Sequence, residues 1–312
     1  MVDMIKVLLA KKEVTYGVDS LPTAALNAVL TRNFSSKPVE VDRIARNLDA
    51  KTFGATPDAP SNERQTVSYE VELAGSGAAG TAPAWMELLE GAGMAAPALT
   101  ATIKADQKMG LPSVAPSSLT QHHYIGNQLR KMTGSRGSFA IDITAGQFPF
   151  LSLNYTGIIP AAAPFSVAVP AATVLTKWKE PVEVNTANTL ITLDGYAAFV
   201  RYLKIDANVQ TNIRSLVGSR YINRGQHSIA IEMMIEAPSL AAKDYYSELR
   251  TGAQLPLAVT HGLVAGNIIE IACANVEITG ISESEEDNKL MFSISAIATI
   301  SAGQDDILIT SR

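Results

Sequence analysis

The side chains best suited to metal binding or nucleophilic chemistry are the four histidines and the single cysteine. His122 and His123 are adjacent, and adjacent residues on a strand point to opposite faces, so the pair is poorly placed to ligate one metal. His227 and His261 have no Cys, Asp or Glu beside them at metal-binding spacing. We therefore predict no metal site, and we interpret the pair as exposed residues.

The remaining candidate sites have simpler structural interpretations. Cys273 lies in an apolar run without a basic neighbour that would activate its thiol, which favours a small core residue. The glycine-rich segment 75–80 lacks the Lys-Ser/Thr ending of a phosphate-binding loop. The acidic segment 282–288 lacks the ligand spacing of a calcium loop and is typical of a solvated turn. We predict no catalytic residue and no cofactor, and the protein is not expected to be an enzyme.

The composition limits the class of protein. The 312 residues are 47% hydrophobic and 18% charged, which supports a folded chain long enough for two domains. A formal net charge of −5 provides no basic field for sequence-specific DNA binding. One cysteine cannot form an intrachain disulfide, so we expect folding in the cytoplasm. The apolar segment 158–175 is broken by Pro160, Pro164 and Pro170, which excludes a continuous membrane-spanning helix and predicts no membrane partner.

Alternating apolar and polar residues predict a mainly β fold. In 66–74 the apolar side chains fall on one face and the acids on the other, as in a half-buried antiparallel strand. Segments 138–144 and 148–155 predict a β-hairpin. In the second half we expect a strand over 228–236 and a hairpin of 268–278 with 290–300. Its connection, 280–289, is acidic and expected to be exposed.

Each half also carries one short helical pattern before its hairpin. The first covers 82–90 and ends at Gly91, and the second covers 239–251, with Ser239 as N-cap and Gly252 after its end. Because the same elements occur twice in the same order, we predict an internal duplication. The predicted boundaries are an N-terminal arm and first strand over 1–38, a β domain over 39–157, a Pro/Ala-rich linker over 158–180 and a second β domain over 181–312.

Several short segments of the first half resemble a known family. They are 6–17 with Pro22, 82–89, 129–139 and 144–157. In order and character these segments are similar to the major tail tube proteins of bacteriophages with long, non-contractile tails. The resemblance covers most of the first half and thins in the second.

The resemblance implies a β-sandwich or barrel with one flanking helix per unit, which supplies part of a ring in a stacked tail tube. Its partners would be further copies of itself and other tail proteins such as the tail tip, tape measure and terminator. Genomic DNA would pass through the tube without specific binding. The protein would belong to the virion tail and assemble in the host bacterial cytoplasm. Since such rings hold six units, a duplicated chain suggests a pseudo-hexameric trimer, and a hexamer is the alternative.

Within this interpretation, acids on the polar strand faces are candidates for the tube lumen, where they would repel phosphate. They are Glu70, Glu72, Glu232 and Glu236. An ordinary solvated outer face explains the same periodicity. The segments 53–64 and 217–225 read as unusually long loops and are candidates for contacts between stacked rings. Their candidate residues are Phe53, Thr56, Asp58, Arg64, Ser219, Arg220, Tyr221 and Arg224. Mobile surface loops are the alternative interpretation.

A second class of function fits a mainly β chain. A monomeric β-sandwich module could bind a ligand or carbohydrate through its loops. Trp85 and Trp178 are the only tryptophans, and neither segment predicts an exposed aromatic platform for sugar. Self-association distinguishes the two classes, because a tube subunit has strand edges that only neighbouring copies can pair.

Overall fold

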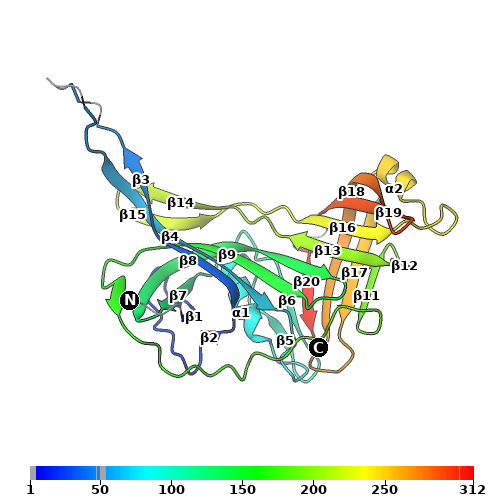
Figure 1. The fold of residues 1–312 in the computed structure, drawn as a ribbon, viewed down its shortest axis with the longest axis horizontal. Helices are drawn as coiled ribbons and strands as arrows, with labels where there is room; N and C mark the ends of the chain where they lie inside the picture. The colour runs from blue at the N-terminus through cyan, green and yellow to red at the C-terminus, as the bar shows by residue number, and fades with distance from the viewer. Residues whose placement is uncertain (1–4, 47, 50–53, 302) are drawn as a thin grey trace.

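The computed structural model describes residues 5–46, 48–49, 54–301 and 303–312, and it is mainly β, as predicted. The first half contains β1 (Lys6–Lys12), β2 (Ala28–Val29), β3 (Arg32–Ile44), β4 (Ala59–Glu72), α1 (Ala84–Gly91), β5 (Ala98–Thr100), β6 (Lys104–Lys108), β7 (Leu119–Ile125), β8 (Gln128–Thr144), β9 (Phe150–Ile158) and β10 (Phe165–Val167). The second half contains β11 (Thr189–Leu193), β12 (Tyr196–Ala197), β13 (Val200–Asp206), β14 (Thr211–Leu216), β15 (Ser219–Arg224), β16 (Ala230–Glu236), α2 (Tyr245–Thr251), β17 (Gln254–His261), β18 (Ile269–Glu286), β19 (Lys289–Ala298) and β20 (Leu308–Ser311). Figure 1 shows how these elements are arranged.

Strand pairing follows one scheme in both halves, and every pair is antiparallel. In the first half β1 pairs with β7, β7 with β8, β8 with β9, β9 with β4 and β4 with β3. In the second half β11 pairs with β17, β17 with β18, β18 with β19, β19 with β16 and β16 with β13. The helices occupy equivalent places in the two halves. Along the chain, α1 lies between β4 and β5, and α2 lies between β16 and β17.

The long strand β8 belongs to both layers of the first sandwich. Its beginning pairs with β7, whereas its later part pairs with β9 and, through Ala140–Thr144, with β13 of the second half. Residues 132–137 are buried in succession, because both faces of the strand are covered there. Beyond them burial alternates, which leaves one polar face exposed. The pairing of β8 with β13 joins the sheets of the two halves edge to edge.

Aromatic side chains fix α1 against the first sandwich. Trp85 is buried and its indole Nε1–H donates to the carbonyl oxygen of Ala74 at 2.7 Å. The Tyr155 ring stacks on that of Tyr69 at a centroid distance of 5.9 Å, and the Tyr155 hydroxyl donates to the Leu88 carbonyl at 2.7 Å. Burying such rings contributes about 2 kcal/mol each, while the two side-chain hydrogen bonds satisfy polar groups that would otherwise destabilise the core.

The second helix is shorter than predicted. It begins at Tyr245 rather than near Ser239, because Asp244 is the N-cap and its carboxylate accepts from the Ser247 backbone N–H at 3.1 Å. Ser239 instead closes a turn, its carbonyl accepting from the Ala242 and Lys243 N–H groups. The C-terminal end matches the prediction, since Gly252 has φ 62° in the left-handed region.

Three segments predicted as loops are strands. Segment 59–64 belongs to β4, segment 219–224 is β15 paired with β14, and 280–286 continues β18 against β19. The hairpin of β3 with β4 projects from the body of the molecule beside β14 and β15 (Figure 1). No helix of the described residues is long and apolar enough to cross a membrane.

The Pro/Ala-rich segment 158–180 runs along the first half. Its β10 pairs with the beginning of β8. The Val174 N–H donates to the Ala24 carbonyl at 3.1 Å, and the Trp178 indole N–H donates to the Ala28 carbonyl at 2.9 Å. Trp178 therefore anchors this segment to the N-terminal region, and Trp85 belongs to the core, so neither tryptophan forms an exposed platform.

Candidate functional site

One face of the sheet that joins the two halves is polar. On β4 the residues Val67, Tyr69 and Val71 are buried, while Glu70 and Glu72 lie on the opposite face. This alternation is the period of two expected for a strand with one buried side. The structure thus places two of the predicted acids on the face away from the first core.

The other two predicted acids occupy β16 in the same way. Ile231, Met233 and Ile235 are buried, and Glu232 and Glu236 lie on the opposite face. Glu236 forms an ion pair with Lys289, with the Lys Nζ 3.6 Å from a Glu carboxylate oxygen. Each pair of acids therefore belongs to the polar side of its own half.

Strand register brings these acids into one cross-strand row. Glu72 is opposite Phe150 of β9, and Phe150 is opposite Asp142 of β8. Asp142 is opposite Lys204 of β13, which is opposite Glu232. At about 4.8 Å between neighbouring strands, Glu72 and Glu232 are about 19 Å apart along the sheet. The four predicted acids thus share one face of a sheet that spans both halves.

This face is mainly acidic but partly neutralised. Glu70 accepts from the Arg32 Nε–H at 2.6 Å and from the Asn33 side-chain amide at 3.0 Å. The Arg32 guanidinium also lies over the Phe150 ring, 3.1 Å from its centroid. Asp142 and Asp206 add carboxylates on β8 and β13, where Lys204 is the basic neighbour. Sequence periodicity identified Glu70 and Glu72 but could not reveal that Arg32 neutralises one of them, since that contact depends on the register of β3.

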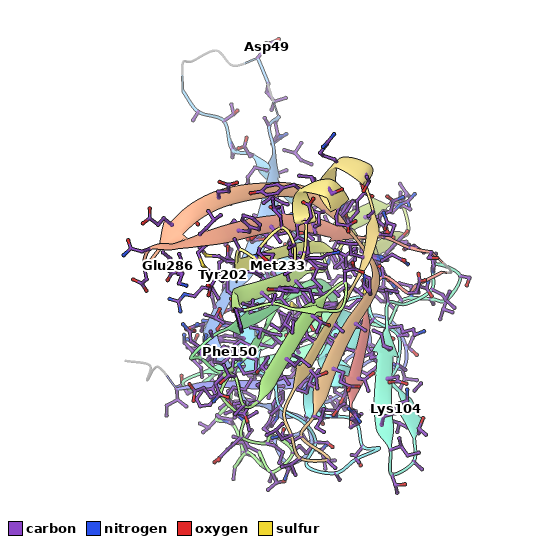
Figure 2. The ribbon with its side chains drawn as sticks, turned by 90° about the vertical axis from the view of Figure 1, so that its right-hand side faces the viewer. Asp49, Lys104, Phe150, Tyr202, Met233 and Glu286 are labelled. Atoms are coloured by element: carbon purple, nitrogen blue, oxygen red, sulfur yellow. The ribbon has the colours of Figure 1, made fainter. Side chains whose placement is uncertain are left out.

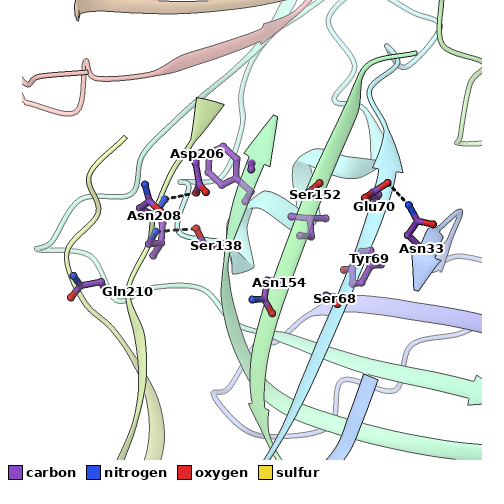
Figure 3. Close-up of a pocket in the computed structure, with 14 residues that line it drawn as sticks. Asn33, Ser68, Tyr69, Glu70, Ser138, Ser152, Asn154, Asp206, Asn208 and Gln210 are labelled. Carbon is purple, nitrogen blue, oxygen red and sulfur yellow. Dashed lines mark hydrogen bonds between the residues drawn. The ribbon is translucent and has the colours of Figure 1, made fainter. Parts of the chain in front are cut away.

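A shallow groove of about 620 Å³ crosses this face (Figure 3). Its polar lining consists of hydroxyls, amides and two carboxylates from both halves, among them Ser68, Glu70, Ser138, Ser152, Asn154, Asp206, Asn208 and Gln210. The Ser138 hydroxyl accepts from the Val209 N–H at 2.9 Å, and Asp206 accepts from the Asn208 N–H at 2.9 Å. Such a lining favours a hydrated surface over a closed site for chemistry.

The residues predicted for ring stacking divide into two groups. Thr56, Asp58, Ser219 and Arg220 are exposed. Arg64 forms ion pairs with Glu40 and Asp42, and the Arg224 guanidinium donates to the Gly110 carbonyl at 3.0 Å. The Tyr221 ring contacts Tyr16 edge to face at 6.5 Å. Phe53 lies outside the described residues. The second group therefore makes contacts within the chain.

A buried cluster that the sequence did not reveal connects β15 to the first half. Glu13 is 7% exposed, and its carboxylate accepts from Ser118 and Thr120 hydroxyls at 2.6 and 2.8 Å. The Arg136 guanidinium lies 4.5 Å from the Tyr16 ring centroid and donates to the Ile222 carbonyl at 2.6 Å. The Tyr16 hydroxyl accepts from the Ile222 N–H at 2.6 Å. We call Glu13, Tyr16, Arg136 and Ile222 the β15 clamp.

Burial shifts the acid–base properties of the β15 clamp. It raises the pKa of the Tyr16 hydroxyl and lowers the pKa of the Arg136 guanidinium. Both groups keep their ordinary charge at neutral pH, because arginine remains protonated far above that range. The contacts of Tyr16 and Arg136 therefore position β15, and no local spacing in the sequence predicts them.

The histidine pair is buried, contrary to the predicted exposed position. His122 is 5% exposed and lies 2.9 Å from a carboxylate oxygen of Asp19, which Lys131 also contacts at 3.2 Å. His123 is fully buried and packs against Phe34 at a ring distance of 5.7 Å. The sequence did not predict this burial because β7 contains several polar residues. In the structure, however, the strand is covered on both sides.

Cys273 is buried in β18, as predicted. Burial raises the pKa of its thiol to about 12, so very little thiolate forms at neutral pH. The side chain accordingly fills core volume, and its environment does not activate it as a nucleophile.

The chain matches a family of known proteins. Residues 6–305 match the family model described as phage tail tube protein, which covers nearly the whole chain. A search of curated proteins finds no match. The family match therefore extends over the second half, where the sequence resemblance had thinned.

Proposed function

The chain belongs to the phage tail tube protein family, and we propose that three copies form a ring in which the two halves of each chain occupy six quasi-equivalent positions. The family consists of structural tail components rather than enzymes, and membership implies self-assembly into stacked rings and contact with other tail proteins. Within the family, the number of chains per ring is the specific point of this proposal.

The observation that carries the proposal is the repeated pairing scheme. The order β1, β7, β8, β9, β4, β3 has the same antiparallel neighbours as the order β11, β17, β18, β19, β16, β13. Even the strand that flanks the beginning of β8, β10, has a counterpart in β20 beside β18. This recurrence supports two copies of one unit; the first runs from β1 to β9 and so takes in the segment before residue 39, and the second runs from β11 to β19.

We further propose that the polar face bearing Glu70, Glu72, Glu232 and Glu236 lines the tube. A lumen through which DNA passes must not bind the DNA. A surface of carboxylates repels the phosphates, because salt does not fully screen charges that lie within a Debye length of each other. The acids of both halves share one face, which supports a common lining. The ion pairs of Glu70 with Arg32 and of Glu236 with Lys289 leave Glu72 and Glu232, with Asp142 and Asp206, as the main negative charges of that lining.

The two projecting hairpins are our candidates for contacts between stacked rings. The exposed residues Thr56, Asp58, Ser219 and Arg220 lie on or beside them. Because the β15 clamp fixes β15 to the first half, the second hairpin is held in a defined direction, as a stacking contact requires. Tail tip, tape measure and terminator proteins remain the expected further partners, and assembly in the host cytoplasm remains the expected location.

Electron microscopy of the purified chain over a concentration series tests the tube. We expect hollow stacked rings to appear as concentration rises. A strictly monomeric particle at every concentration, even with a tail initiator added, would contradict the proposal and favour a monomeric binding module that uses the polar groove.

A further inference from the structure

The last strand of the chain joins the two halves at a second place. On one edge β20 pairs with β18 of its own half, where Ile309 lies opposite Ile271. On its other edge it pairs with β6 of the first half, where Ile309 lies opposite Gln107. Figure 2 shows β6, which begins at Lys104, beside the red β20. The sheet of the second half therefore continues through β20 into β6 and β5 of the first half.

Strands β5 and β6 belong to a segment that has no equivalent in the second half. Residues 92–118 separate α1 from β7, whereas only residues 252–253 separate α2 from β17, the counterpart of β7. We call residues 92–118 the insertion. It is attached to the first half, because the Gln107 side-chain amide donates to the Met86 carbonyl oxygen of α1 at 2.9 Å.

Side chains of both halves meet along the contact between β6 and β20. The Thr310 hydroxyl of β20 donates to the Asp106 carboxylate of β6 at 2.6 Å. The Arg224 guanidinium, at the end of β15, donates to the Gly110 carbonyl oxygen of the insertion at 3.0 Å. The insertion thus contacts two separate strands of the second half.

The glycine-rich segment 75–80 packs beside this contact, and two of its glycines allow backbones to meet. A methyl group at Gly75 would lie 2.1 Å from the Gly266 carbonyl oxygen, in the connection between β17 and β18. A methyl group at Gly80 would lie 2.3 Å from the Thr102 backbone nitrogen, in the β5–β6 turn. Both distances are too short for non-bonded atoms, so only glycine permits the approach. The segment therefore lies between the insertion and the second half.

We propose that the insertion and β20 form a brace that fixes the second half against the first before assembly, so that each chain enters the ring as a rigid pair of units. This inference rests on the duplication in the proposed function. A ring of three chains has three boundaries within chains and three between chains. The brace belongs to the first kind alone, because the second half has no insertion. Accordingly β10, the counterpart of β20, pairs with β8 alone among the described residues.

The physical effect of the brace is pre-organisation. The halves are joined at β8–β13 and, separately, at β6–β20. A single pair of strands allows the two sheets to turn about it, whereas two pairs in different strands restrict the angle between the halves. Because the units are ordered before chains meet, association loses less conformational freedom, and rings should form at a lower concentration.

Gly75→Ala tests the brace without changing β6 or β20. Its methyl group would push against Gly266 of the second half, and because Gly75 lies outside the left-handed region its own backbone accepts alanine. We expect the amide hydrogens of β6 and β20 to exchange at least about tenfold faster than in the parent, and the concentration at which rings appear to rise by a similar factor. The matched control is Gly280→Ala, which has open space around it and should leave both quantities unchanged.

A disulfide across β6 and β20 provides the rescue. Lys108 and Leu308 lie directly opposite each other, where Cβ atoms are about 4.5–5.5 Å apart, so Lys108→Cys/Leu308→Cys should form a disulfide on mild oxidation. Oxidation of this pair should return the Gly75→Ala chain to the ring-forming concentration of the parent, and reduction should reverse the rescue. In a chain that keeps Gly75, the oxidised pair should leave ring formation intact.

Two results would overturn the brace and leave the proposed function standing. One is a chain with Gly75 and the oxidised pair that no longer forms rings, since β6 and β20 would then have to separate on assembly. The other is faster exchange in Gly75→Ala with rings at the parent concentration. If the parent forms no rings, the proposed function fails, and exchange in its single chain still tests the brace. Exchange in β6 and β20 as slow as in β8 and β9 would support it, and exchange about a hundredfold faster would overturn it.

Discussion

His123 is the residue whose burial has the clearest chemical consequence. Neither ring nitrogen has a hydrogen-bond partner, and burial lowers the pKa of the imidazole to about 3, with the charge of Arg130 adding to the effect. The folded chain therefore keeps His123 neutral where the unfolded chain, with a pKa near 6.5, binds a proton. It follows that the free energy of unfolding rises with pH between about 3 and 6.5, and falls as the solution is acidified.

We predict that His123→Leu flattens this dependence. Between pH 7 and pH 5 the unassembled parent should lose about 2 kcal/mol more stability than the variant, at up to ~1.4 kcal/mol per pH unit below 6.5. Urea unfolding at several pH values measures the difference. If the free energy of unfolding changed equally with pH in the parent and the variant, the prediction would be contradicted, because His123 would then take up its proton in the folded chain as well.

The acids of the polar face give a second prediction at this scale. Glu72→Lys/Glu232→Lys should permit tube assembly but slow DNA delivery by roughly tenfold, because lysines would hold the phosphates that carboxylates repel. The control Glu180→Lys/Glu183→Lys has the same net charge change on the exposed segment before β11 and should deliver DNA normally. Plaque formation by phage carrying each variant measures this. An equal defect in both variants would contradict the assignment of the face.

The strands that the sequence analysis missed lie at the ends of hairpins. In Thr66–Ala74 one face is buried, so hydrophobic alternation marks the strand. No residue of segments 59–64 and 280–286 is buried, and Ile222 is the one buried residue of 219–224, so none of the three shows the alternating burial of a strand on a core. Hydrophobic periodicity indicates which residues are buried, so it cannot identify a strand that projects from the core. The β8–β9 hairpin was predicted with its turn in the right place, but β8 begins at Gln128 rather than at residue 138, and β9 ends at Ile158 rather than at residue 155.

The β15 clamp illustrates a second limit of sequence reasoning. Glu13 and Arg136 are separated by more than a hundred residues, and each carries an ordinary charge in a short polar context. Only the closed fold brings Arg136 and Tyr16 to Ile222, with the Glu13 carboxylate near both. The four candidate acids could be predicted because each depends on the alternation of its own strand, whereas the clamp depends on three distant segments meeting.

The β15 clamp is expected to stabilise the β14–β15 hairpin. Tyr16→Phe removes the acceptor for the Ile222 N–H and should lower the free energy of unfolding by about 1–2 kcal/mol. Tyr246→Phe is the control, since its hydroxyl contacts Glu283 at an exposed position where water replaces the bond, and it should leave the free energy of unfolding nearly unchanged. Hydrogen exchange should locate the change in β15. Equal costs for both variants would contradict a positioning role for Tyr16.

At the scale of the whole molecule, the two halves share a scheme of strand pairing but little sequence. The order of elements in the sequence predicted the duplication, and the recurrence of strand neighbours now supports it more strongly. What the sequence could not supply is the junction of β8 with β13, because pairing between distant edges leaves no local pattern.

The number of chains in one ring tests the central claim most directly. Cryo-electron microscopy of assembled tubes, viewed in cross-section, counts the chains and their symmetry. We expect true three-fold symmetry with six similar β-sandwich densities, which corresponds to three copies of the 33.1 kDa chain per ring. Six complete chains per ring, with twelve such densities, would contradict the account.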